Sequence, residues 1–424
     1  MYNYPDFALK VNQIYESYDW EQVVQIPLQG VDLASNKIQL HNQEAVSFGS
    51  SSYVGLHKDS RIIEAGVDAM RKYGVLYSSS RSYTYLNLHN EFEDLLEKIF
   101  GLPVLATIQT TMAHFPAMQL LMLPTHAAII DMNAHATLQS MIQLPKAQGM
   151  KVEIVKHSDL DMLESKIKRL YDQHDKIWYV ADGIYSMYGD GAPVNALTEL
   201  LAKYEKLHIY YDDAHGMSWA GPHGAGYVWK YLPAGHERVV MATSLGKGFG
   251  IGGGALICPN KDVKKMMTRA GGSAVFCTQL PVQMLGSGIE SAKIHLSDEI
   301  YRLQDKVKSN INFFIEQAQK YSIPVVDFSH TPVFFIACGG QQFGLKLCQR
   351  VREAGYYVNV GIYPAVGPKN TGLRVSLTSE HSHEEIEGLV KTIAEQMNIL
   401  MDEFGISMHD VEKAFSQVKI GIAV

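Results

Sequence analysis

The feature of this sequence that most constrains its fold is an alternation of short apolar runs and longer segments with helical periodicity. Six of the runs have strand-forming composition, and they lie at residues 127–131, 151–155, 177–181, 207–212, 239–242 and 254–258. Helical periodicity marks segments between them, as in residues 159–174 and 196–204. Because strands that alternate with helices form crossover units, we expect an α/β fold whose mostly parallel sheet is covered by helices.

After this region the pattern changes, which indicates a second, smaller domain. Residues 294–321 predict one long helix that links the two domains. The strands and the helix expected beyond it lie at residues 323–338, 356–362, 373–377 and 383–404. Ser382 and Glu385 form a capping-box pattern at the start of that last helix. The predicted domains are an N-terminal arm with a short strand, a large domain, and a linking helix with a small α+β domain, at residues 1–55, 56–293 and 294–424.

Composition and charge exclude several classes of protein. The chain has 424 residues, of which 46% are hydrophobic and 19% charged, as is typical of globular domains. Its formal net charge of −7 gives no overall attraction for nucleic acid or anionic lipid, so we expect no nucleic-acid partner. We expect no transmembrane segment, because the most apolar stretch, residues 115–130, is short and interrupted. We expect no signal peptide, because residues 1–6 have no basic start and no apolar run. The four cysteines lack zinc-site spacing, so we expect no metal and a reducing cytoplasm.

Lys247 lies in a run of glycines directly after a predicted strand. A Walker phosphate loop would need a glycine where Met241 stands and a Ser or Thr where Gly248 stands. Gly248, Gly250 and Gly253 match a dinucleotide fingerprint, but a predicted strand follows instead of a helix. The remaining interpretations are a lysine that forms a Schiff base, with glycines that let a cofactor approach, and an exposed turn lysine.

Asp212 ends another predicted strand, and His215 follows three residues later. A carboxylate at the carboxyl end of a strand lies where α/β sheets bind ligands. If the ligand is pyridoxal 5'-phosphate (PLP), this carboxylate would keep the pyridine nitrogen protonated so that the ring accepts electrons. His215 would then hydrogen-bond the phenolic oxygen. The alternatives are a divalent-metal site formed by Asp212 and His215 and a capped turn without a ligand.

Three further segments carry weaker signals. His135 follows a predicted strand and would stack on a flat ring, with a structural histidine as the alternative. Asp182 and Ser186 place an acid and a hydroxyl at another strand end, where a polar turn is the alternative. Arg374 lies within an apolar strand of the smaller domain. A buried arginine needs an anionic partner, which would be a substrate carboxylate or an internal salt bridge.

Along the chain the motifs follow in the order His135, Asp182 with Ser186, Asp212 with His215, Lys247 and Arg374. In this order they resemble the motifs of the fold-type I PLP-dependent enzymes. Within that group the chain resembles the α-oxoamine synthase family, which includes 8-amino-7-oxononanoate synthase, 2-amino-3-ketobutyrate CoA ligase, serine palmitoyltransferase and the autoinducer synthases. The strings Asp-Asp-Ala-His-Gly, Gly-Lys-Gly-Phe-Gly and Leu-Arg-Val-Ser-Leu-Thr carry the resemblance, which extends over about residues 46–400. It implies the fold-type I PLP-dependent transferase fold, with a large domain and a smaller C-terminal α+β domain.

The resemblance also implies roles for individual residues. Lys247 would hold PLP covalently and then act as the acid–base group, while Asp212 would pair with the pyridine nitrogen and His215 would contact the phenolic oxygen. Arg374 would hold the carboxylate of the amino acid. The other implied cofactor contacts are His135, Asp182, Ser186, Ser244 and, at the phosphate of the neighbouring subunit, Thr278.

The chain departs from the family pattern in two places. The family's Ser-Gly-aromatic phosphate cradle aligns with Gln109-Thr110-Thr111, and its following Asn aligns with His114. Backbone N–H groups at a helix N-terminus can still hold phosphate, so we expect Thr110 and Thr111 to bind the cofactor. The family's Asn near the substrate falls at Ser51, which we therefore expect near the substrate.

The activity that the resemblance implies is a PLP-dependent acyl transfer. An amino acid would condense with an acyl-CoA or another acyl-thioester to give an α-amino ketone, with release of CoA and, where the family decarboxylates, of CO2. The alternatives are an aminotransferase that acts on an amino acid and a 2-oxo acid, and a catalytically silent scaffold. Because the family builds its site at a dimer interface, we also expect a homodimer.

Overall fold

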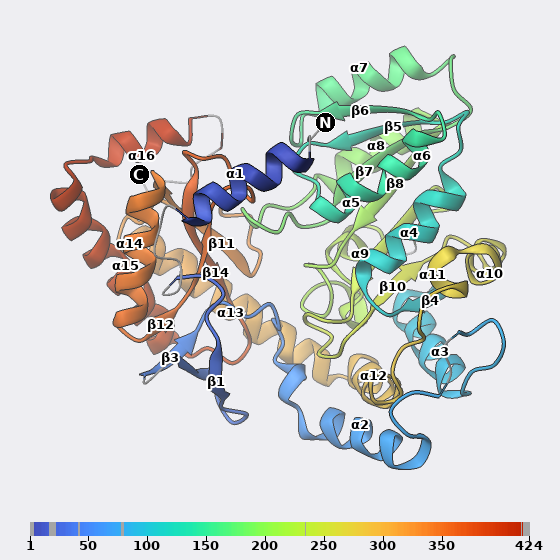
Figure 1. Ribbon diagram of the computed structural model, residues 1–424, viewed down its shortest axis with the longest axis horizontal. Coiled ribbons are helices and arrows are strands. Elements are labelled where there is room, and N and C mark those ends of the chain that lie inside the picture. The colour runs from blue at the N-terminus through green and yellow to red at the C-terminus, as the bar shows by residue number, and fades with distance from the viewer. Residues whose placement is uncertain are drawn as a thin grey trace. The chain divides into compact units, whose positions relative to one another are not determined.

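The computed structural model describes residues 4–16, 23–40, 43–77, 80–233, 235–416 and 418. The chain divides into two compact units (Figure 1). The larger unit consists of Ser52–Ser186 and Gly191–Asp305, and the smaller of Met1–Ser51, Met187–Asp190 and Lys306–Val424. Among the described residues, no helix has both the length and the apolar character needed to cross a membrane.

A seven-stranded sheet forms the centre of the larger unit, in the order β4-β10-β9-β8-β7-β5-β6. The strands are β4 (Val104–Thr107), β5 (Ala127–Asp131), β6 (Lys151–Val155), β7 (Ile177–Asp182), β8 (Leu207–Asp212), β9 (Val239–Ser244) and β10 (Gly254–Ile257). The five strands from β5 to β9 pair in parallel, and β10 pairs antiparallel with both β9 and β4. The prediction of a mostly parallel α/β sheet is therefore confirmed.

Helices cover this sheet, which explains why its central strands read as apolar runs (Figure 1). The helices of the unit are α2 (Ser60–Tyr73), α3 (Leu88–Phe100), α4 (Thr110–Leu121), α5 (Ala136–Met141), α6 (Gln143–Ala147), α7 (Leu160–Leu170), α8 (Val194–Lys203), α9 (Tyr227–Tyr231), α10 (Lys261–Ala270), α11 (Gly272–Val275) and α12 (Val282–His295), with short 3-10 turns at Leu56–Lys58 and Pro222–Gly224. Met118 of α4 and Leu138 of α5 join Trp178 and Tyr210 of the strands in one fully or almost fully buried cluster.

The predicted continuous helix over residues 294–321 is wrong in one respect. Helix α12 ends at His295, and a new helix, α13 (Glu299–Lys320), begins after a three-residue break and carries the chain into the smaller unit. The break has a local cause in Ser297. Its hydroxyl donates to the carbonyl of Ile294 at 2.8 Å and accepts from the backbone N–H of Glu299 at 3.2 Å. One serine thus closes the first helix and caps the second.

The smaller unit contains two small sheets, and its α+β character agrees with the prediction. Their orders are β1-β2-β3-β12 and β11-β14-β13. The strands are β1 (Leu28–Val31), β2 (Lys37–Leu40), β3 (Gln43–Ser47), β11 (Val333–Gly339), β12 (Tyr356–Tyr357), β13 (Asn359–Gly361) and β14 (Thr371–Ser376), and the helices are α1 (Tyr4–Glu16), α14 (Gln341–Glu353), α15 (His383–Phe404) and α16 (Met408–Ala414). The capping box at Ser382 and Glu385 is present, with both reciprocal hydrogen bonds.

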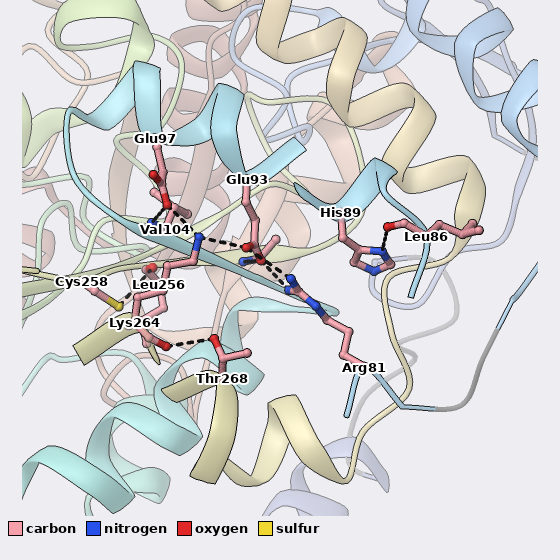
Figure 2. Close-up of polar contacts among 11 residues, drawn as sticks. Arg81, Leu86, His89, Glu93, Glu97, Val104, Leu256, Cys258, Lys264 and Thr268 are labelled. Atoms are coloured by element: carbon pink, nitrogen blue, oxygen red, sulfur yellow. Dashed lines mark hydrogen bonds and ion pairs between the residues drawn. The ribbon is translucent and has the colours of Figure 1, made fainter. Parts of the chain in front are cut away.

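A buried ion network fixes the β4 edge of the large sheet (Figure 2). Glu93 of α3 pairs with Arg81 and, at 3.0 Å, with Lys264 of α10. It also accepts from the backbone N–H of Ala106 in β4 at 3.1 Å. Glu97, one turn further along α3, pairs with the same Lys264 at 2.7 Å. Burial opposes the charge of Glu93, but the two cations outweigh it and lower its pKa.

Candidate active site

Several residues singled out in the sequence lie at the carboxyl ends of parallel strands in the sheet of the larger unit, an edge that runs across the strands. Asp182 is the last residue of β7, Asp212 of β8 and Ser244 of β9. Asp182 and Asp212 are direct partners across the two strands. Because parallel strands end together at this edge, it is where open α/β sheets bind ligands. The candidate active site is therefore built on the carboxyl ends of these three strands.

Asp212 is a buried carboxylate held by two donors. Its Oδ2 lies 3.0 Å from Nε2 of His114, and its Oδ1 accepts from the backbone N–H of Ala214 at 3.1 Å. Burial opposes the charge of Asp212, but His114 and the nearby Lys247 outweigh that effect and lower its pKa to about 2. Asp212 is therefore negative at neutral pH, as pairing with a protonated ring nitrogen requires.

The pKa of Asp182 is shifted in the opposite direction to that of Asp212. It is buried and accepts a hydrogen bond from the backbone N–H of His135 at 3.0 Å. Burial and the neighbouring charge of Asp212 raise the pKa of Asp182 well above the usual value for a carboxyl. The pKa values of two adjacent buried carboxyls are thus shifted in opposite directions, which favours the charged form of Asp212 and the neutral form of Asp182.

Lys247 lies in the loop between β9 and β10, and its amine contacts a histidine. Its Nζ lies 2.7 Å from Nε2 of His215, and Nδ1 of His215 lies 2.6 Å from the hydroxyl of Tyr53. The indole Nε1 of Trp219 donates to the backbone carbonyl of His215 at 2.7 Å, which holds the loop after β8. Lys247 is half-buried and its amine is engaged, unlike a solvated turn lysine.

Glycines bring the Lys247 turn close to neighbouring backbone. Gly250 has a φ of +85°, and a Cβ there would lie 2.7 Å from the backbone N of His57. A Cβ on Gly248 would lie 2.7 Å from the carbonyl oxygen of Met217. Strand β10 follows the turn, so the segment does not open the helix that a dinucleotide fingerprint needs.

The start of α4 has the chemistry of a phosphate cradle. Thr110 and Thr111 are its first two residues, and the first backbone N–H groups of a helix have no intrahelical partner. A Cβ on Gly254 of β10 would lie 2.5 Å from the backbone N of Thr110, so this glycine allows the close approach. Ser244 accepts from the backbone N–H of Gly246 at 3.2 Å. A glycine on a neighbouring strand therefore provides space that the cradle sequence itself lacks.

His135 is the N-cap residue of α5. Its Nδ1 lies 2.7 Å from the hydroxyl of Thr137 and also accepts from the backbone N–H of that residue at 3.3 Å. Burial lowers the pKa of His135, while the opposite charges of Asp212 and Lys247 both act on its ring. A neutral imidazole in this environment is suited to stacking on an aromatic ring.

None of the four remaining predicted residues is the last residue of β7, β8 or β9. Ser186 is half-buried in the loop after β7, and Thr278 is exposed after α11. Ser51 and Arg374 belong to the smaller unit. Arg374 of β14 is buried, and its Nη1 donates to the hydroxyl of Ser376 at 3.0 Å. The functional roles of these four residues stay predictions.

Comparison with known proteins finds relatives over most of the chain, although no family model matches it. The 8-amino-7-oxononanoate synthase of Alkaliphilus metalliredigens is 27% identical over 369 residues, which cover 86% of this chain and 91% of that protein. The 8-amino-7-oxononanoate synthase of Thermosipho melanesiensis is 26% identical over 393 residues, which cover 91% of this chain and 96% of that protein.

Solved structures share the fold. The serine palmitoyltransferase of S. paucimobilis, solved with bound PLP–myriocin, has a TM-score of 0.85 at 19% identity and covers 94% of this chain and 99% of that one. The 8-amino-7-oxononanoate synthase of Francisella tularensis has a TM-score of 0.69 at 21% identity and covers 84% of this chain and 98% of that one. Over most of its length the chain is similar to members of the α-oxoamine synthase family.

Three contacting residues of the candidate site had no role assigned from the sequence: Tyr53, His114 and Tyr210. Tyr53 and His215 are 162 residues apart, and His114 and Asp212 are 98 apart. Local sequence patterns do not reveal such pairs. The sequence offered two signals that these residues lie near the site. Tyr53 stands two positions after Ser51, and His114 aligns with an Asn of the family.

Proposed function

We propose that the protein is a PLP-dependent acyltransferase that condenses an amino acid with an acyl-CoA or another acyl-thioester. The products are an α-amino ketone and the free thiol, with CO2 where the amino acid is decarboxylated. The observation that carries the proposal is the joint position of Lys247 and Asp212, an engaged amine and an ionised carboxylate beside the same sheet edge. The similarity to 8-amino-7-oxononanoate synthases over most of the chain supports the reaction type.

The side chains at this edge fit PLP. Asp212 is ionised and so matches a protonated ring nitrogen, and the amine of Lys247 matches the aldehyde. The N-terminus of α4 and the hydroxyl of Ser244 match the phosphate, and the close approach of Gly254 leaves space beside that helix. When bound, PLP supplies the electron sink that makes proton loss from a free amino acid feasible.

The chain's own residues then have separate tasks. Lys247 removes the proton from the α-carbon of the amino acid, and His215, 2.7 Å from its amine, assists by sharing that proton. Asp212 keeps the ring nitrogen protonated, and His135 stacks on the ring. Arg374 binds the carboxylate of the amino acid through its guanidinium.

We further propose a homodimer in which Thr278 reaches the cofactor phosphate of the partner. Two segments near Thr278 are tied together, because Ser80 donates to the carbonyl of Val275 at 2.7 Å and Gln279 donates to the carbonyl of Thr84 at 3.0 Å. The exposed aromatic side chains on these segments, Tyr83 at 89% and Phe276 at 87% exposure, are typical of a protein interface.

The decisive experiment offers the purified protein, with added PLP, a panel of amino acids and acyl-CoAs. Thiol release together with a new amino ketone in the mass spectrum is the expected result. Transfer of the amine to a 2-oxo acid without thiol release would instead identify an aminotransferase. Borohydride reduction followed by digestion should label the peptide that contains Lys247, and Lys247→Ala should remove the label; no label on wild-type protein would support a catalytically silent scaffold.

The reducing cytoplasm remains our proposed compartment.

A further inference from the structure

Behind Asp212 lie two buried side chains that form a chain of hydrogen bonds. His114 of α4 and Tyr210 of β8 are both fully buried, and Tyr210 precedes Asp212 by two residues on the same face of the strand. Nδ1 of His114 lies 2.8 Å from the Tyr210 hydroxyl, and Nε2 lies 3.0 Å from Oδ2 of Asp212. Both ring nitrogens of His114 are therefore engaged.

The position of the protons in this chain follows from the partners. Burial, with help from the charge of Asp212, raises the pKa of Tyr210 well above its usual value, so the phenol keeps its proton. We assign that proton to the hydrogen bond toward Nδ1, which leaves the ring proton of His114 on Nε2. Nε2 then donates to Oδ2 of Asp212, while the Ala214 N–H donates to Oδ1. Each carboxylate oxygen thus has a fixed donor.

We propose that Tyr210 and His114 are positioning residues that act through Asp212, holding its carboxylate charged and aimed at the ring nitrogen of the cofactor. Neither residue needs to touch PLP or the substrate. The inference rests on the proposed PLP-dependent function and adds to it the residues that set the strength of one cofactor contact.

Other charged and titratable groups also act on this relay. Lys247 favours the charge on Asp212 through space, whereas burial and the charge of Asp212 raise the pKa of the adjacent Asp182 and so favour its neutral form. Cys258 lies near Tyr210, and burial raises the pKa of its thiol to about 12, so it stays uncharged at neutral pH. His114 is therefore the direct side-chain donor to Asp212, with the other groups contributing through space.

The test compares binding of PLP with binding of 1-deaza-PLP, an analogue in which carbon replaces the ring nitrogen. The variants of full-length protein are Tyr210→Phe, His114→Leu and His114→Asn, and Tyr211→Phe is the matched control because it removes a buried hydroxyl from the next position of β8. We expect Tyr210→Phe and His114→Leu to weaken PLP affinity about tenfold or more, the scale of one hydrogen bond to a charged group. His114→Asn, which keeps an N–H donor, should retain more of the affinity than His114→Leu.

For 1-deaza-PLP the affinity of all variants should equal that of wild type. Equal losses for PLP and the analogue would overturn the inference, because they would indicate only structural damage. Unchanged PLP affinity in both Tyr210→Phe and His114→Leu would also overturn it. If His114→Leu does not fold, Tyr210→Phe decides, since it removes one hydroxyl and no ring.

Failure of wild-type protein to bind either compound would count against the proposed function itself. In that case long-range ¹⁵N–¹H NMR of labelled histidines, assigned with His114→Asn, still tests the relay: a proton on Nε2 of His114 supports it and a proton on Nδ1 alone overturns it.

Discussion

At the scale of single residues, the amine of Lys247 is linked to a buried tyrosine through one imidazole. The Tyr53 hydroxyl lies 2.6 Å from Nδ1 of His215, whose Nε2 lies 2.7 Å from Nζ of Lys247. Tyr53 is fully buried and has a φ of +38°, an unfavourable backbone conformation for a tyrosine. The fold thus holds the backbone of Tyr53 in a strained conformation, and in this conformation the Tyr53 hydroxyl contacts and orients the imidazole of His215.

We therefore predict that Tyr53→Phe lowers kcat of the condensation by about tenfold to a hundredfold, the range expected when a positioned acid–base group loses its orientation. The affinity for PLP should change little, because the phosphate cradle and Asp212 are untouched. Steady-state kinetics and a fluorescence titration with PLP measure the two quantities. An unchanged kcat would show that Tyr53 has only a packing role.

Asp182 makes a distinct prediction about pH. Its pKa is raised well above its usual value by burial and by Asp212, so the folded protein binds a proton there that the unfolded chain releases. Above the unfolded pKa of about 4, this group makes the folded state less stable as pH rises, by at most about 1.4 kcal/mol per pH unit.

Asp182→Asn removes the titration but keeps an oxygen for the N–H of His135. Urea unfolding from pH 5 to 8 should therefore show a flatter loss of stability in this variant than in wild type. Asp213, another buried carboxyl with a raised pKa, contributes in the same direction and remains in both proteins. Parallel pH profiles for the two proteins would contradict the charge state assigned to Asp182.

At the scale of elements, the ion network around Glu93 joins α3, α10 and strand β4 (Figure 2). Glu93→Gln would remove the carboxylate that pairs with Arg81 in a poorly solvated place and would leave Lys264 paired with Glu97 alone. We predict a loss of about 3–5 kcal/mol in the free energy of unfolding, as for other broken buried ion pairs. Glu97→Gln is the matched control, because its side chain is 29% exposed, and it should cost much less. Similar losses for both variants in urea unfolding would contradict the special role of Glu93.

Elements were predictable where one local pattern determines them. Five of the six apolar runs became the buried strands β5 and β7 to β10, because burial between helices requires an apolar residue on both faces of a strand, whereas β6 is a largely exposed edge strand. Helix α15 begins at His383, directly after its N-cap Ser382, because its capping box is encoded within four residues. The break between α12 and α13 escaped prediction because apolar periodicity continues through it, and a single serine hydroxyl makes the difference.

The candidate site was predictable to the extent that its residues follow strands. Asp182, Asp212 and Ser244 each end a strand, so topology alone brings them to one edge. Tyr53 and His114 reach the same place from other parts of the chain, and their partners are set by tertiary packing. Chemistry that depends on such long-range hydrogen bonds needs the folded structure.

At the scale of the whole molecule, assembly is part of the proposed function. The segments that carry the exposed rings of Tyr83 and Phe276 are held together by the hydrogen bonds of Ser80 and Gln279. Burying such rings in a symmetric interface would give the hydrophobic gain that stabilises a dimer. The same contact would bring Thr278, two residues after Phe276, towards the partner subunit.

We predict that Phe276→Glu converts a dimer into a monomer in sedimentation velocity and lowers the condensation activity by about a hundredfold, because a charge at the centre of an apolar interface has no partner. Ile154→Glu is the control, since Ile154 is also exposed, at 65%, but lies on β6 at the opposite edge of the sheet from β4. That variant should remain dimeric and active. A wild-type protein that sediments as a monomer with full activity would contradict the proposed role of Thr278, because its phosphate contact needs a second subunit.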